Sequence, residues 1–77
     1  MDGVKMIVYQ RLKDLREDAD KSQEDIAKII GTSQSYYAQY ENGKRSIPFD
    51  RIITLAKYYN VSLDYLAGFI DTPRKLK

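Results

Sequence analysis

Apolar residues recur along the chain at intervals of three and four positions, which is the spacing of one face of an α-helix. The alternation of apolar and polar residues that marks a half-buried strand is not sustained anywhere in the sequence. The pattern therefore predicts short helices throughout. Their expected ranges are 6–18, 23–30, 34–41, 48–59 and a last short helix that begins after Ser62 and ends by Gly68.

The apolar positions of each predicted helix fall on one side and define the expected core. The first helix contributes Val8, Leu12, Leu15 and Ala19, and the second contributes Ile26, Ala27 and Ile30. The fourth contributes Phe49, Ile52, Ile53, Leu55 and Ala56. We predict an all-α fold, a compact bundle of five short helices that forms a single domain over residues 1–70, followed by a flexible basic tail over residues 71–77.

Residues that begin and end helices cluster in the middle of the chain. Ser22 is followed three residues later by Asp25, which resembles a capping box and places a carboxylate in the favourable first turn. Gly31 stands where a helix end favours a left-handed residue, and Ser33 is the expected N-cap of the next helix. The Asn-Gly pair at 42–43 is expected to end that helix, because both residues tolerate positive φ. Two short helices joined by such a glycine turn form the skeleton of a helix-turn-helix.

The third predicted helix has two different faces. Tyr37 is expected to point inward and to hold this helix against the second, where Ala27 leaves room for a close crossing. The outward face carries Gln34, Ser35, Ala38 and Gln39. A helix that faces only solvent more often carries Lys and Glu. Because a glutamine amide both donates and accepts, it matches the N6/N7 pair of adenine in the major groove of DNA.

The 77 residues suffice for one domain, and they include neither cysteine nor histidine. This composition removes disulfides, thiolate zinc sites and the commonest nucleophile–base pairs. Asp14, Glu17 and Asp18 share a helical face, but they lack a cleft or a histidine beside them. We therefore expect no enzymatic activity, no metal, no cofactor and no small-molecule ligand.

The sequence also predicts a cytoplasmic location. The start of the chain does not resemble a signal peptide, because Asp2 is acidic and the apolar stretch up to Tyr9 is broken. No apolar run approaches the roughly 20 residues that span a bilayer, so no membrane association is expected.

The net charge is only +2, but the charges are unevenly distributed. Residues 14–25 contain six acids and two bases, whereas residues 26–77 contain eight bases and four acids. We therefore expect a molecule with one basic face, with the acidic first helix turned away from a nucleic acid.

Several stretches resemble one known family. Residues 22–35 (SQEDIAKIIGTSQS) and 40–45 (YENGKR), followed by 55–57 (LAK) and 61–66 (VSLDYL), are similar to the Cro/phage-repressor (XRE) family of transcriptional regulators. The resemblance covers about residues 8–67. It implies a lambda-repressor-like fold whose second and third helices form the helix-turn-helix. It also implies a sequence-specific regulator, a repressor rather than an activator, whose partner is double-stranded DNA.

The resemblance further implies roles for single residues. Base reading would fall to Gln34, Ser35 and Gln39. Contacts to the DNA backbone or the groove edge would come from Gln23, Ser33, Tyr36, Asn42, Lys44 and Arg45. Arg16 and Glu41 match positions that form a partly buried, structural ion pair between the first helix and the end of the third. Tyr37 stands where the family often has Ile or Val, so the packing must hold a larger ring.

A single recognition helix covers only about 4–6 base pairs, so we expect a homodimer on a palindromic operator. The candidate dimer contact consists of the apolar residues that remain near the end of the chain, Tyr65, Leu66, Phe69 and Ile70.

Two other functions remain open. The chain could be the antitoxin of a toxin–antitoxin pair, or a helix-turn-helix used only for protein–protein interaction. The seven tyrosines would suit a stacking surface for single strands, but Tyr37 and Tyr40 occupy helix-packing positions. The basic residues at 74–77 are expected to be a disordered end rather than a DNA-contacting arm.

Overall fold

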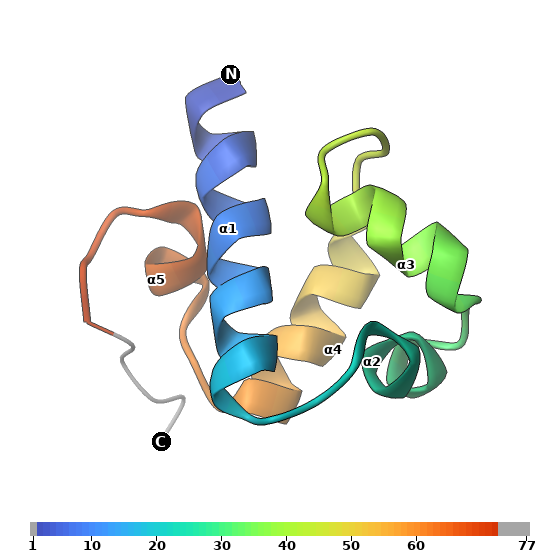
Figure 1. Ribbon diagram of the computed structural model, residues 1–77. Helices are drawn as coiled ribbons and strands as arrows, with labels where there is room; N and C mark the ends of the chain where they lie inside the picture. Colours follow the sequence, from blue (N-terminus) through green and yellow to red (C-terminus); the bar gives the residue numbers. More distant parts are fainter. Residues whose placement is uncertain (1, 73–77) are drawn as a thin grey trace.

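The computed structural model describes residues 2–72, with side chains from residue 6 onward. Its helices are α1 (Asp2–Asp18), α2 (Gln23–Ile30), α3 (Gln34–Glu41), α4 (Phe49–Tyr59) and α5 (Leu63–Ala67). In Figure 1, α5 lies on one side of α1, and α2, α3 and α4 lie on the other. The predicted all-α bundle is confirmed, and α2 and α3 form its helix-turn-helix. The basic tail at 73–77 lies outside the described residues.

The first helix is longer than its apolar pattern predicts. We expected it to begin at Met6, but α1 already begins at Asp2. The four added residues contain one poor helix former, Gly3, which lies close to the start of the helix. The prediction was wrong because it rested only on the apolar residues that share one side of the helix, from Val8 onward, and α1 begins before the first of them. Pro48 likewise precedes α4 as its N-cap residue rather than forming its first turn.

Local hydrogen bonds explain where α2 and α3 begin. The Ser22 hydroxyl accepts from the Asp25 amide at 3.0 Å, and the Asp25 carboxylate accepts from the Ser22 amide at 3.0 Å, which completes the predicted capping box. This pair of bonds also lowers the pKa of the Asp25 carboxyl below its ordinary value. The Ser33 hydroxyl accepts from the Tyr36 amide at 3.1 Å, as an N-cap does.

Left-handed backbone ends α2, α4 and α5. Gly31 has φ 77° and closes α2, and Asn60 has φ 58° and closes α4. The Asn-Gly pair behaves differently from the prediction, since Asn42 remains at φ −92° and only Gly43 turns to φ 81°. Glycine adopts this conformation without the cost that a Cβ imposes, so the turn needs only one such residue.

The core draws side chains from every helix. Its largest fully buried members are Leu12, Ile26, Tyr37, Leu55 and Leu66. Tyr37 is 0% exposed and lies between the helix-turn-helix and the rest of the bundle, as its inward position predicts. A bundle of this size gains its stability mainly from burying such apolar faces, so the orientation of α3 depends on this core.

Two residues that we assigned to the core are exposed. Phe49 is 68% exposed, because it occupies the first turn of α4, before that helix meets its neighbours. Ala19 is exposed because α1 ends at Asp18 and the chain then turns through Asp20, whose φ is 56°. Tyr9, which the stripe omitted, is 4% exposed and takes a core position beside Leu12.

Candidate nucleic-acid interface

The helix-turn-helix presents the polar face of α3 to solvent. Its three-residue connection, 31–33, is fixed by the left-handed Gly31 and by a bond of 2.9 Å from the Thr32 amide to the Ala27 carbonyl. Tyr37 and Tyr40 bury the opposite face of α3. The exposed or partly exposed residues of the outer face are Gln34, Ser35, Tyr36, Ala38 and Gln39. The predicted base readers therefore occupy one accessible surface, which we call the α3 outer face.

A chain of side-chain hydrogen bonds links this face to the interior. The Gln34 Nε2 atom donates to Gln23 Oε1 at 2.9 Å, and Gln23 Nε2 in turn donates to Glu41 Oε1 at 3.2 Å. The two amides belong to the first turns of α3 and α2, so the bond crosses between the two helices of the motif. Because each amide has a fixed partner, Gln34 has fewer rotamers to lose when it contacts a ligand.

Arg16 and Glu41 form a bidentate ion pair beneath this chain. Arg16 Nε lies 2.8 Å from Glu41 Oε2, and Arg16 Nη2 lies 3.1 Å from Glu41 Oε1. The side chains are only 12% and 4% exposed. Arg16 also donates to the Lys21 carbonyl at 2.9 Å, so the same side chain holds the end of α1 and the end of α3.

The electrostatics of the pair agree with this geometry. Burial alone would raise the pKa of the Glu41 carboxyl, but the hydrogen bonds to that carboxyl, chiefly from Arg16, outweigh burial and bring the pKa below its ordinary value. The bond to Glu41 likewise raises the pKa of Arg16. Burial raises the pKa of the neighbouring Tyr37 hydroxyl, which stays neutral. Gln23 and the neutral Tyr37 phenol therefore adjoin the Glu41 end of the pair, and Glu17 lies 3.9 Å from Arg16 Nη2 at the other end.

Arg45 returns from the following loop to the other end of the α3 outer face. Its Nε atom donates to Gln39 Oε1 at 2.7 Å, and its guanidinium lies 4.7 Å from the centre of the Tyr36 ring. Tyr36 also packs edge-on against Tyr40, with ring centres 5.5 Å apart. Sequence reasoning placed Gln39, Tyr36 and Arg45 at one interface, but it did not connect them to one another.

The remaining loop residues are arranged as a turn. The Asn42 side-chain oxygen accepts from the Lys44 amide at 3.0 Å, so it shapes the loop. Lys44 itself is exposed. The Ser33 hydroxyl is similarly used as the cap of α3. Of the predicted backbone contacts, Asn42 and Ser33 therefore have local structural roles, while the Lys44 ammonium extends into solvent.

One basic residue near this surface was missed. Lys13 of α1 lines a polar cleft together with Gln23, Ala38, Glu41 and Asn42. We expected α1 to turn away from a nucleic acid because it is acidic, but this side of the helix carries a lysine next to the helix-turn-helix. Only the packing of α1 brings this lysine beside α2 and α3, so the spacing of residues within those two helices does not reveal it.

The candidate dimer contact is partly wrong. Leu66 is 1% exposed and belongs to the core, because it lies on the side of α5 that packs against α1. Tyr65 is half-buried under Arg11, whose guanidinium lies 4.1 Å from its ring centre. Arg11 also donates to the Ile70 carbonyl at 2.9 Å. Phe69 is 73% exposed and is the most accessible apolar residue of this group.

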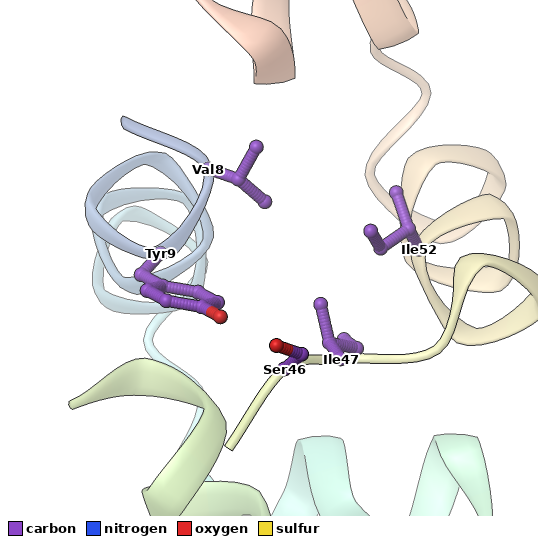
Figure 2. Close-up of a pocket in the computed structure, with 5 residues that line it drawn as sticks. All are labelled: Val8, Tyr9, Ser46, Ile47 and Ile52. Atoms are coloured by element: carbon purple, nitrogen blue, oxygen red, sulfur yellow. The ribbon is translucent and has the colours of Figure 1, made fainter. Parts of the chain in front are cut away.

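A second cleft lies between α1 and α4. Figure 2 shows Val8 and Tyr9 of α1 opposite Ile52 of α4, with Ser46 and Ile47 between them. This cleft is small, about 120 Å³, and mainly apolar. Within residues 2–72, no cluster of three or more His, Cys, Asp or Glu side chains is arranged to hold a metal ion. In the same part of the chain, no helix has the length and apolar character needed to cross a membrane.

The fold and the α3 outer face define a helix-turn-helix protein, and comparison with known proteins specifies the class. The helix-turn-helix family model matches residues 12–66. The chain is 39% identical over 64 residues to YobD, an uncharacterized HTH-type transcriptional regulator of Bacillus subtilis. It is 34% identical over 62 residues to RstR, a cryptic phage CTXphi transcriptional repressor of Vibrio cholerae. It is also 31% identical over 62 residues to the antitoxin PezA of Streptococcus pneumoniae.

The chain therefore belongs to the XRE-type helix-turn-helix family of transcriptional regulators. The three matches cover 83%, 80% and 80% of this chain. They cover 57%, 56% and 39% of the relatives, so the chain spans little more than half the length of the first two.

Proposed function

We propose that this chain is a sequence-specific double-stranded DNA-binding regulator, acting as a repressor, that inserts α3 into the major groove. The observation that carries the proposal is the α3 outer face, where two exposed or partly exposed glutamines are each held by a hydrogen bond. Gln34 is bonded to Gln23 at 2.9 Å, and Gln39 is bonded to Arg45 at 2.7 Å. Fixed amides on an exposed helix are suited to reading base edges, because recognition then requires little new ordering.

The surroundings of α3 favour the phosphate backbone. Gln23 begins α2, and the unpaired amides of a helix N-terminus attract anions. Lys44 and Arg45 follow α3, and Lys13 flanks it from α1. These cations lie beside the polar face, so in a groove-bound complex they would contact phosphates and set the register of the base readers, Gln34, Ser35 and Gln39.

We further propose that the regulator acts as a homodimer on a palindromic operator. One short recognition helix contacts too few base pairs for useful discrimination among genomic sites, and a two-fold dimer doubles that number. Phe69, with Ile70 and Tyr65 beside it, offers the exposed apolar surface for such a contact. Leu66 has no part in it, because it is buried within one chain.

The experiment is a selection from a pool of random-sequence duplexes at about 150 mM salt. We expect enrichment of a short palindromic motif over several rounds. Binding that disappears at this salt without enriching any sequence would contradict the proposal, because nonspecific electrostatic contacts alone behave in that way. It would instead favour a helix-turn-helix used only for protein–protein interaction.

The similarity to the antitoxin PezA favours one second candidate, the antitoxin of a toxin–antitoxin pair. An antitoxin would also select an operator, so the selection alone does not separate the two. Co-expression with the product of the adjacent gene does. Stable co-purification, with relief of that product's toxicity, would identify an antitoxin, and independent elution of a harmless neighbour would favour the simple regulator.

A further inference from the structure

Arg45 is held at four points in the loop that follows α3. Its backbone amide donates to the Gln39 carbonyl at 3.1 Å, and its own carbonyl accepts from the Tyr9 hydroxyl at 3.3 Å. Its guanidinium lies 4.7 Å from the centre of the Tyr36 ring, and its Nε atom donates to Gln39 Oε1 at 2.7 Å. A solvated charge, or an arginine that only contacts phosphate, requires none of these constraints.

The bond to Arg45 determines which way round the Gln39 amide lies. A guanidinium carries donors and no acceptor, so a glutamine that faces it must turn its oxygen toward it. The opposite orientation would place the NH2 group against another donor. With the oxygen committed to Arg45, the two N–H donors of Gln39 remain.

Gln34 uses the opposite end of its amide: its nitrogen is bonded within the protein, whereas in Gln39 it is the oxygen. One N–H of its Nε2 atom is committed to Gln23 Oε1, at 2.9 Å, and this bond does not use the Gln34 oxygen. Gln34 therefore retains one acceptor and one further donor, the combination that matches N6 and N7 of adenine. The two glutamines of α3 are the same residue type, but their neighbours leave them with different hydrogen-bonding groups.

We propose that Arg45 is a positioning residue that sets the base preference of Gln39. The inference rests on the proposed reading of DNA by α3. Held by Arg45, Gln39 donates to a base edge that presents acceptors: guanine offers two, O6 and N7, thymine offers O4, and adenine offers only N7 beside its amino group. The amino groups of adenine and cytosine offer donors to the same atoms and are disfavoured. The Tyr36 ring packs against the Arg45 guanidinium, which in turn holds the Gln39 amide, so the orientation of Gln39 depends on all three side chains.

The test begins with the random-duplex selection applied to the wild type and to Gln39→Ala. The base pair whose preference is lost in Gln39→Ala marks the pair that Gln39 reads. The same selection is then applied to Arg45→Lys and Arg45→Ala. Arg45→Lys is the decisive variant, because it keeps the positive charge and a donor but loses the planar group that stacks on Tyr36. Its ammonium on a flexible stem is therefore not held where it fixes the Gln39 oxygen.

We expect the preference at the Gln39 pair, about tenfold for an ordinary base contact, to fall below about threefold in both Arg45 variants. Preferences at other pairs should remain as in the wild type. The double variant Gln39→Ala/Arg45→Ala should lose no more of this preference than Gln39→Ala alone. Lys44→Ala is the matched control, since it removes the adjacent loop cation and should weaken all sequences equally.

Base analogues then test the direction of hydrogen bonding. If the selected pair contains guanine, replacing it by 7-deazaguanine removes the N7 acceptor and should weaken wild-type binding. If the pair contains thymine, 4-thiothymine presents a weaker acceptor at the same place and should do likewise. Gln39→Ala should be insensitive to either analogue. A wild type that ignores these analogues but loses affinity when the amino group of the paired base is removed would overturn the proposed orientation.

The outcomes separate this inference from the proposed function. A wild type that selects no motif contradicts the function itself. A wild type that selects a motif, together with an Arg45→Lys variant that keeps the full preference at the Gln39 pair, overturns only the positioning role. Equal weakening at every pair in Arg45→Lys would also overturn it, and thermal unfolding of that variant by circular dichroism checks that its fold is intact.

Discussion

Replacing Glu41 by glutamine tests how the base-reading surface is anchored. The substitution keeps the shape of the side chain but removes its charge. In the wild type, Glu41 accepts two bonds from Arg16, at 2.8 and 3.1 Å, and one from Gln23, at 3.2 Å. Its side chain is 4% exposed, and that of Arg16 is 12% exposed. The variant therefore leaves a largely buried guanidinium whose remaining counter-charge is the more exposed Glu17, 3.9 Å from Arg16 Nη2.

The expected loss is large for a chain of this size. Removing one partner of a buried ion pair costs about 3–5 kcal/mol. At roughly 0.05–0.15 kcal/mol per residue, a domain of 77 residues has a total stability of about 4–12 kcal/mol. Glu41→Gln should therefore lower the melting temperature by at least about 12 °C, since each kcal/mol corresponds to about 4–8 °C in small domains. Urea unfolding at pH 7, followed by circular dichroism, measures the change.

The pH dependence gives an independent signature. Because the folded-state pKa of Glu41 lies below its ordinary value of 4.5, ionised Glu41 stabilises the fold above that pH. This contribution is lost as the pH falls through the depressed pKa. The wild type should therefore lose stability between about pH 5 and pH 2, where a carboxylate with a depressed pKa takes up its proton. Glu41→Gln lacks this carboxylate and should lose less stability over the same interval.

A double variant serves as the control. Replacing both partners, as in Arg16→Met with Glu41→Leu, removes the unpaired charge, and apolar substitutes for a buried pair are often neutral. It should recover at least half of the stability lost in Glu41→Gln. The reasoning would be refuted if Glu41→Gln were within about 1 kcal/mol of the wild type at pH 7 and kept the wild-type acid profile.

Three further predictions concern the loop cation, two glycines and a buried hydroxyl. Lys44→Ala should weaken binding to all duplexes similarly and reduce the slope of log K against log salt by about 0.9, as measured by fluorescence anisotropy over a salt series; an unchanged slope would remove Lys44 from the phosphate contacts. Gly68→Ala should destabilise the fold more than Gly31→Ala in thermal melts. Both positions have positive φ, +84° at Gly68 and +77° at Gly31, so alanine is strained at each. At Gly68 the added Cβ would also lie 2.9 Å from the Ile7 side chain, whereas at Gly31 it meets no described atom within 4 Å. Equal losses would contradict the steric part of this argument. Tyr59→Phe should be neutral or stabilise by up to about 1 kcal/mol in urea unfolding, because the Tyr59 hydroxyl is buried without a hydrogen-bond partner among the described residues. A clear loss of stability would show that this hydroxyl is satisfied in solution.

The parts of the fold that depend on local chemistry were predictable from the sequence. Ser22 and Asp25 cap the start of α2, and Gly31 ends it, as predicted. Ser33 is likewise the predicted N-cap of α3. These signals act within three or four residues, so they can be seen without knowing the tertiary structure. The errors arose where packing decides. Phe49 has an apolar side chain at an apolar position of α4, but no neighbour covers it.

The candidate site shows the same division. The residues of the α3 outer face follow from helical spacing and from the family resemblance. The bonds that orient them do not, because they join residues six and eleven positions apart, Gln39 with Arg45 and Gln23 with Gln34. Lys13 precedes Ala38 by 25 positions, and only the packing of α1 beside the motif brings the two residues to one cleft. Sequence patterns identify the residue types at such a site, while their pairing depends on the folded geometry.

The most direct test of base reading by α3 is the ratio of two dissociation constants, for the selected operator and for a scrambled duplex, in the wild type and in Gln34→Ala. Gln34→Ala is expected to lose about 1–3 kcal/mol of binding free energy on the operator and little on the scrambled duplex. The preference for the operator over the scrambled duplex should therefore fall by the corresponding factor. Equal losses on both duplexes, with the ratio preserved, would contradict the claim that Gln34 and the face it belongs to read the bases.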